Sequence, residues 1–116
     1  ICGDFFETDF GIDYDAVIST SALHHFKPEE KKELYKKIFN SLKKNGQFIN
    51  CDKISLNQET QDWCINELEN NFDNYKHIDT PLTVENEISI LNEIGFINVE
   101  TSKVDKEDYI LLKSRK

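Results

Sequence analysis

Two adjacent histidines, His24 and His25, are the sharpest chemical feature of the sequence. An imidazole titrates close to neutral pH, so either ring could act as a general base beside a substrate pocket. Neighbouring residues on a helix point about 100° apart, which suits the pair poorly to holding one metal ion. No third ligand stands at a matching spacing, so we predict no metal site. The alternative is that each ring packs at a helix end and bonds a backbone carbonyl.

Hydroxyl and carboxyl side chains follow two predicted strands. Ser19, Thr20 and Ser21 come directly after the apolar run 16–18, which is typical of a parallel strand buried on both sides. Asp52 ends the next predicted strand, so we expect it at the same edge of the sheet. Ligands of open α/β sheets bind at that edge. The hydroxyls could instead cap an ordinary turn, and Asp52 could be a turn acid.

A helix that precedes Asp52 is predicted over residues 28–44. Pro28 suits its first position, Lys43 and Lys44 in its last turn match the helix dipole, and Asn45-Gly46 supplies its stop. Its apolar residues recur once per turn and form one stripe that faces a sheet. These residues are Leu34, Tyr35, Ile38, Phe39 and Leu42.

The predicted elements alternate between strands and helices. They are a strand over 14–19, the helix over 28–44, a strand over 47–52, helices over 58–72 and from Thr83 to Gly95, and strands over 97–103 and 109–113. Alternation of this kind predicts an α/β fold with a parallel sheet and crossover helices. The last two strands are joined by a short charged connection, which predicts a final antiparallel hairpin.

Composition excludes several classes of protein. The 116 residues include 14 basic and 22 acidic side chains, for a net charge of −8, so no basic footprint for nucleic acid is present. Six lysines of the first helix are expected on a solvated face: Lys31, Lys32, Lys36, Lys37, Lys43 and Lys44. No apolar run is long enough to span a membrane. Cys2, Cys51 and Cys64 lack the pairing or spacing of a disulfide framework or zinc site, which favours a reducing, cytoplasmic setting.

Four segments, in this order and spacing, resemble the C-terminal half of a class I S-adenosylmethionine-dependent methyltransferase. Gly3-Asp4-Phe5 resembles the acidic loop after the family's third strand, and residues 14–26 resemble its fourth-strand motif with the paired histidines. Residues 42–52 resemble the fifth-strand motif, and residues 83–113 resemble the closing helix and antiparallel hairpin. Each motif alone is weak, but together they cover nearly the whole chain.

The resemblance implies a set of site residues. Asp4 would accept a hydrogen bond from the adenine amino group of S-adenosylmethionine, and Phe5 would either lie against the adenine or belong to the core. The stretch Ser19-Thr20-Ser21 would contact the methionine part of the cofactor, largely through its backbone. His24 and His25 would lie near the transferred methyl group. Asp52 and Trp63 would meet a small-molecule acceptor, although a helical stripe of aromatic residues is more often core.

The sequence also departs from the family pattern. It has four glycines and no GxG, so the Gly-rich cofactor loop is absent, as are the family's first strands. It has no methionine and begins at Ile1, so we expect residues 1–116 to form a single truncated domain. Such a domain would expose an open sheet edge, bind the cofactor weakly, and pair with a second copy or with a chain that supplies the missing strands. The alternative function is that of a non-catalytic remnant or partner subunit.

Overall fold

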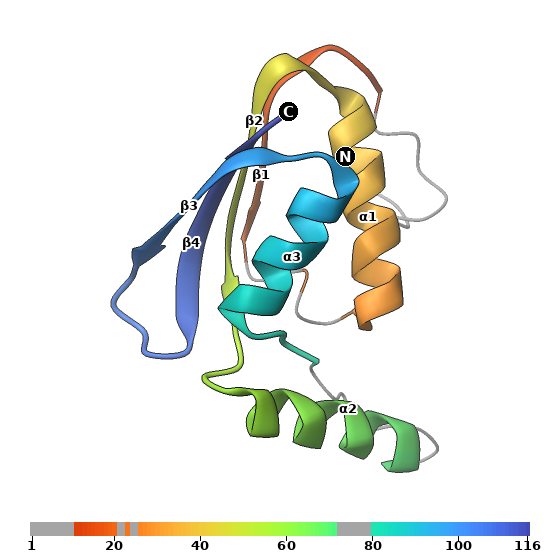
Figure 1. The fold of residues 1–116 in the computed structure, drawn as a ribbon, viewed down its shortest axis with the longest axis vertical. Helices are drawn as coiled ribbons and strands as arrows, with labels where there is room; N and C mark the ends of the chain where they lie inside the picture. The colour runs from red at the N-terminus through yellow and green to blue at the C-terminus, as the bar shows by residue number, and fades with distance from the viewer. Residues whose placement is uncertain (1–10, 21–22, 24–25, 72–79) are drawn as a thin grey trace.

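The computed structural model describes residues 11–20, 23, 26–71 and 80–116. The described elements follow the predicted order, β-α-β-α-α-β-β (Figure 1). They are β1 (Tyr14–Thr20), α1 (Pro28–Ser41), β2 (Leu42–Lys53), α2 (Gln58–Asn71), α3 (Val84–Ile94), β3 (Ile97–Lys103) and β4 (Tyr109–Arg115).

The four strands form one mixed sheet in the order β1-β2-β4-β3. β1 runs parallel to β2, while β4 is antiparallel to both β2 and β3. The predicted α/β fold class, with its parallel pair and its final antiparallel hairpin, is therefore confirmed.

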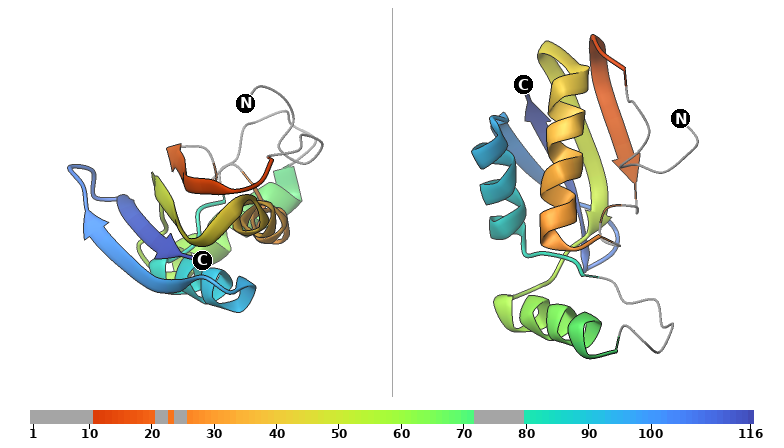
Figure 2. Two further views of the ribbon diagram at one scale, coloured as in Figure 1. Left: turned by 90° about the horizontal axis from the view of Figure 1, so that it is seen from above. Right: turned by 90° about the vertical axis from the view of Figure 1, so that its right-hand side faces the viewer.

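Helices α1 and α3 pack side by side on one face of the sheet (Figure 2). The apolar stripe predicted for α1 faces the sheet, and Leu34, Tyr35 and Ile38 are buried there. Phe48 of β2 and Phe96, which follows α3, meet in this core with ring centroids 5.7 Å apart. The face that these helices cover is called the covered face below.

The first helix ends earlier than the sequence pattern indicates. α1 begins at Pro28 as predicted, and Glu30 accepts a hydrogen bond from the Lys27 amide at its start. It ends at Ser41, and Leu42 is already extended, so the placement of Lys43 and Lys44 in a last helical turn was wrong. The predicted stop at Asn45-Gly46 was wrong for the same reason.

Strand pairing overrides the local helix signals at this point. Leu42 pairs with Tyr14 of β1, and the register then skips to Ala16 opposite Gln47. The intervening residues form an irregularity in β2, where Asn45 has a positive φ of 68° and Gly46 approaches the Tyr14 carbonyl. The Asn45-Gly46 pair therefore bends a strand and does not end a helix.

The second helix begins where the sequence predicts it. α2 spans Gln58–Asn71 and lies beyond the end of β2 (Figure 1). Its Gln58 and Gln61 side chains accept hydrogen bonds from the Asn86 side-chain amide group of α3 at 2.9 and 2.8 Å. Trp63 on α2 is 63% exposed, so it is not a core residue. None of the helices in the described part of the chain combines the length and apolar content needed to cross a membrane.

Candidate functional site

The carboxyl ends of β1 and β2 lie side by side because the two strands are parallel and in register. Ser19 stands beside Asn50, and Thr20 stands beside Cys51. This is the edge at which open α/β sheets bind ligands. The structure therefore brings Ser19, Thr20 and Asp52 to one end of the sheet, as the sequence predicted.

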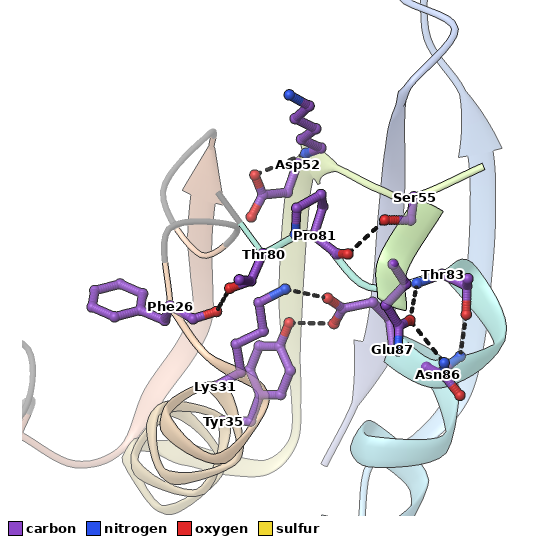
Figure 3. Close-up of polar contacts among 12 residues, drawn as sticks. Phe26, Lys31, Tyr35, Asp52, Ser55, Thr80, Pro81, Thr83, Asn86 and Glu87 are labelled. Atoms are coloured by element: carbon purple, nitrogen blue, oxygen red, sulfur yellow. Dashed lines mark hydrogen bonds and ion pairs between the residues drawn. The ribbon is translucent and has the colours of Figure 1, made fainter. Parts of the chain in front are cut away.

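Asp52 is buried at this end of the sheet, with an exposed fraction of 5%. Its carboxylate accepts a hydrogen bond of 2.8 Å from the Lys53 amide, and its side chain points toward the segment that contains Thr80 and Pro81 (Figure 3). A buried carboxylate at a ligand-binding edge can accept from a donor or orient a neighbouring segment.

Hydrogen bonds hold the segment Thr80–Thr83 across this end of the fold. The Thr80 hydroxyl donates to the Phe26 carbonyl at 2.7 Å, and the Ser55 hydroxyl donates to the Pro81 carbonyl at 2.6 Å. The Ser55 amide donates to the Leu82 carbonyl at 2.9 Å. These bonds link the start of α1, the end of β2 and the start of α3, and we call the segment Thr80–Thr83 with these partners the rim.

A buried polar cluster of three residues joins α1 to α3 beneath this rim (Figure 3). The Lys31 ammonium donates to one Glu87 oxygen at 2.9 Å, and the Tyr35 hydroxyl donates to the other at 2.5 Å. Lys31 is fully buried and Glu87 is 4% exposed. We call Lys31, Tyr35 and Glu87 the polar cluster.

Electrostatics keep the tyrosine of the polar cluster in its neutral, donating form. Burial raises the pKa of Tyr35 well above its ordinary value, and the charge of Glu87 and its hydrogen bond add to that rise. The charge of Asp52 contributes in the same direction. The charges of Glu87 and Asp52 therefore both favour the protonated form of Tyr35.

The prediction that Lys31 lies on a solvated face was wrong. Lys31 precedes Leu34 by three residues and Tyr35 by four, which places it on the apolar stripe of α1. Glu87 likewise precedes Leu91 by four residues on the buried side of α3. A lysine and a glutamate each standing on an apolar stripe is the signal that could have revealed this pair from the sequence.

Asn50 is a second buried polar residue that no pattern in the sequence singles out. It is 2% exposed and stands beside Ser19 on the covered face. Within the described part of the chain its Oδ1 atom is buried without a hydrogen-bond partner. An unpaired buried acceptor is costly, so its place at the ligand-binding edge makes it a candidate contact for a donor of a bound molecule.

A hollow of about 300 Å³ opens between the start of α1 and α2. Its lining carries two carboxylates and one ammonium group around an apolar side chain. The lining residues are Lys27, Pro28, Glu29, Ile65, Glu69 and Thr80. Because Thr80 belongs to the rim described above, this hollow adjoins the ligand-binding edge.

The other predicted site residues fall into two groups. Asp4, Phe5, Ser21, His24 and His25 lie outside the described residues. Trp63 is described and stands exposed on α2. Across residues 11–20, 23, 26–71 and 80–116, no group of three or more potential ligand side chains is arranged to hold a metal ion.

No family model matches the chain. Among curated proteins, it is 37% identical over 60 residues to an uncharacterized methyltransferase from Bacillus cytotoxicus, covering 52% of this chain and 28% of that protein. It is 25% identical over 115 residues to a carboxy-S-adenosyl-L-methionine synthase from Helicobacter hepaticus, covering 86% of this chain and 48% of that protein. The chain thus spans about half, or less, of the curated relatives it matches.

Solved structures match over the whole chain. A putative O-methyltransferase from Nostoc punctiforme superposes with a TM-score of 0.75 at 24% identity, covering 100% of this chain and 36% of that one. Human N-acetylserotonin methyltransferase in complex with S-adenosylmethionine gives 0.73 at 20% identity, covering 98% of this chain and 32% of that one. The chain therefore has the fold of about one third of such a methyltransferase, and the predicted resemblance to class I S-adenosylmethionine-dependent methyltransferases is confirmed at the level of the fold.

Proposed function

We propose that the chain is the acceptor-side part of an S-adenosylmethionine-dependent methyltransferase that acts on a small molecule. The observation that carries the proposal is the meeting of the carboxyl ends of β1 and β2 at one edge, where Ser19 stands beside Asn50. The same fold occurs in human N-acetylserotonin methyltransferase, whose structure holds S-adenosylmethionine.

The polar groups at this edge fit such a cofactor. Asn50 offers a buried amide oxygen that lacks a donor within the described residues, and the strand ends at Ser19 and Thr20 offer backbone groups beside it. Asp4 would accept from the adenine amino group, Phe5 would lie against the ring, and the stretch 19–21 would hold the methionine part. When bound, the cofactor supplies an electrophilic methyl group on a sulfonium, and the protein supplies position and exclusion of water.

The acceptor would lie over the rim and the hollow beside α1. His24 or His25 would remove a proton from an acceptor hydroxyl where attack requires it. Asp52 and Trp63 would contact the acceptor from β2 and α2. The carboxylates of Glu29 and Glu69 in the hollow favour a neutral or cationic small molecule over an anionic one.

The alternative is a non-catalytic methyltransferase-like subunit. It is favoured by β1, a parallel strand on which Ile18 is 69% exposed, whereas parallel strands are normally buried on both faces. The prediction that the run 16–18 is buried on both sides was therefore wrong for the described chain. Both functions use the same fold and the same edge of the sheet. They differ in whether S-adenosylmethionine is bound there.

Equilibrium titration of the demethylated product, S-adenosylhomocysteine, into the 116-residue chain tests the proposal. Because the chain carries one side of the cleft, we expect a dissociation constant on the order of 1 mM, weaker than micromolar. Asp4→Ala is expected to weaken binding about tenfold by removing the adenine contact. Asp105→Ala, in the exposed connection before β4, is the matched control. Equal binding by the two variants would contradict the role of Asp4, and absence of binding would favour the subunit.

A further inference from the structure

We propose that the outer side of α2 is a docking surface for a basic segment of a partner protein. The surface is formed by Leu56, two residues before the helix, and by Glu59, Trp63 and Glu67, which follow one another at intervals of four residues. We call these residues the α2 ridge. The ridge is separate from the edge of the sheet proposed to hold the cofactor, so this docking surface does not rest on the proposed function.

Hydrogen bonds fix which side of α2 faces the rest of the fold. Gln61 Oε1 accepts from the Thr83 amide and from the Asn86 side-chain amide, each at 2.8 Å. Gln61 is 7% exposed, and Ile65, one turn further on, lines the hollow beside α1. Residues two positions apart on a helix point about 200° apart. Trp63 therefore points away from the side held against the fold, and a molecule seated in the hollow would have to extend around α2 to reach it.

The two large apolar side chains of the ridge are open to solvent. Trp63 is 63% exposed and Leu56 is 58% exposed. Figure 1 shows α2 at one end of the molecule, with the other described elements on one side of it only. Tryptophan is among the residues that contribute most to binding at protein interfaces. A tryptophan this exposed, near a second exposed apolar residue, therefore indicates a contact surface.

The charge of α2 selects a cationic partner. The helix carries four carboxylates and no cationic side chain, and these four account for half of the net charge of −8. They belong to Glu59, Asp62, Glu67 and Glu69. Glu59 and Glu67 each lie one turn from Trp63 on the same face of the helix. An arginine or lysine placed on the indole ring is attracted both by the ring and by the carboxylates beside it.

Two local features of α2 favour the arrival of a cation. Glu59 and Asp62 are like charges three residues apart, which destabilises a helix, and none of the ion pairs among the described residues includes Glu59. The last turn carries Glu69 and no basic residue, which is unfavourable with the helix dipole. A basic partner relieves both. The same charges repel nucleic acid and anionic membranes.

The strength of each contact indicates a polypeptide segment as the occupant. At an exposed site a cation on an indole ring raises affinity only about two- to fivefold, and one exposed ion pair adds a similar factor. Useful affinity therefore requires one chain that places cations on Trp63 and the carboxylates and an apolar side chain on Leu56. A second copy of this chain is disfavoured, because each copy brings a net charge of −8.

Trp63 is the only tryptophan of the chain, so its fluorescence reports directly on the ridge. The full chain is titrated with two synthetic peptides of about eight residues, long enough when extended to cover the distance of about 12 Å from Glu59 to Glu67. The peptides lack tryptophan, share the same leucines and differ in carrying arginine or glutamate. The amide of N-acetylarginine, a single cation, is the third probe. Quenching of Trp63 by acrylamide measures how far each probe covers the ring.

The arginine peptide is expected to lower the quenching constant about threefold at saturation, and the glutamate peptide is expected to leave it unchanged. Glu59→Gln is expected to weaken binding of the arginine peptide about two- to fivefold, as for one exposed ion pair. Glu33→Gln, at an exposed position of α1, is the matched control and should bind as the parent chain does. Trp63→Ala, followed by calorimetry, is expected to bind about tenfold more weakly.

Any of five results would overturn the proposal. Three concern the peptides: equal shielding of Trp63 by both, shielding by neither, and binding of the arginine peptide that Glu59→Gln and Trp63→Ala leave unchanged. The fourth is shielding by the single arginine derivative at the concentration that suffices for the peptide, which would assign the ridge to a small cation. The fifth is a dimer in sedimentation velocity that itself shields Trp63, which would assign the ridge to a second copy of this chain.

Discussion

The two faces of the sheet are built from the same strands, but one face is covered by helices and the other is exposed to solvent. On the covered face, Phe48, Leu112 and the helices above them exclude water. Even the charges of Lys31 and Glu87 are buried there, as one ion pair. On the other face, which we call the bare face because neither a described helix nor a described loop covers it, Ile18 of β1 and Leu111 of β4 remain accessible. Apolar character alone therefore does not decide which face is closed; the described fold closes the face onto which its own crossover helices return.

The same contrast separates two ion pairs that join α1 to α3. Lys31 and Glu87 meet at 2.9 Å with side chains 1% and 5% exposed. The next lysine along the helix, Lys32, meets Glu93 at 2.6 Å with side chains 38% and 60% exposed. The two pairs differ in burial, and Glu87 accepts a further hydrogen bond from the Tyr35 hydroxyl.

The largest expected effect comes from breaking the buried pair. Glu87→Gln leaves the Lys31 charge buried without its counter-ion and is expected to lower the free energy of unfolding by about 3–5 kcal/mol. Glu93→Gln is the matched control and is expected to cost less than about 1 kcal/mol. Urea denaturation of both variants measures the difference. Comparable losses would mean that burial does not distinguish the pairs.

The second prediction compares adjacent leucines on the two faces. Leu112→Ala removes a side chain that is 4% exposed and is expected to cost about 2–5 kcal/mol of unfolding free energy. Leu111→Ala, half-buried on the bare face, is expected to cost about 1 kcal/mol because less area is lost from the interior. If Leu111→Ala were as costly as Leu112→Ala in the same denaturation experiment, the bare face would already be covered.

Tyr35→Phe tests how much the tyrosine hydroxyl of the polar cluster contributes to stability. At neutral pH the loss of a hydrogen bond to a charged group is expected to cost about 1.5–3 kcal/mol. The pKa of Tyr35 is raised in the folded state, so above about pH 10 the unfolded chain loses this proton while the folded chain retains it. The contribution of Tyr35 to stability is therefore present below pH 10 and declines as the pH rises further. Between neutral and strongly alkaline pH, the variant should lose stability less steeply than the parent chain, and parallel slopes would contradict this.

The smallest effect is expected at Ser114, whose Oγ atom on the covered face is buried without a partner among the described residues. Ser114→Ala removes a desolvated hydroxyl and is expected to raise the free energy of unfolding by about 0.5–1 kcal/mol. Ser102→Ala, at an exposed position of the bare face, is the control and should change stability little. Destabilisation by Ser114→Ala, seen as a lower thermal midpoint, would indicate that the hydroxyl has a partner.

Much of the fold could be predicted because its signals are local and agree with one another. Thr83 caps α3 by accepting from the Asn86 amide at 3.2 Å, and Gly95 ends it with a positive φ of 129°. The end of α1 could not be predicted, because pairing of Leu42 with Tyr14 is a contact between distant residues that defeats the local stop at Asn45-Gly46.

The relative placement of candidate site residues was predictable where topology alone determines it. Ser19 and Asp52 were assigned to one edge of the sheet because parallel strands end together, and the structure confirms this placement. Lys31 was missed because a run of lysines on a helix usually indicates solvent, whereas this one finds a carboxylate 56 residues away. The roles of His24 and His25 remain predictions, since they depend on a bound cofactor and acceptor.

The most direct test of the central claim is a residue-level map of ligand contact. Amide NMR spectra of the 116-residue chain would be recorded during a titration with S-adenosylhomocysteine. The account predicts the largest shift changes at the carboxyl ends of β1 and β2, at Thr20, Asp52 and Lys53, with Asn45 and Lys116 at the opposite end unaffected. Changes centred on Asn45 and Lys116, or none at saturating ligand, would contradict a cofactor site at this edge.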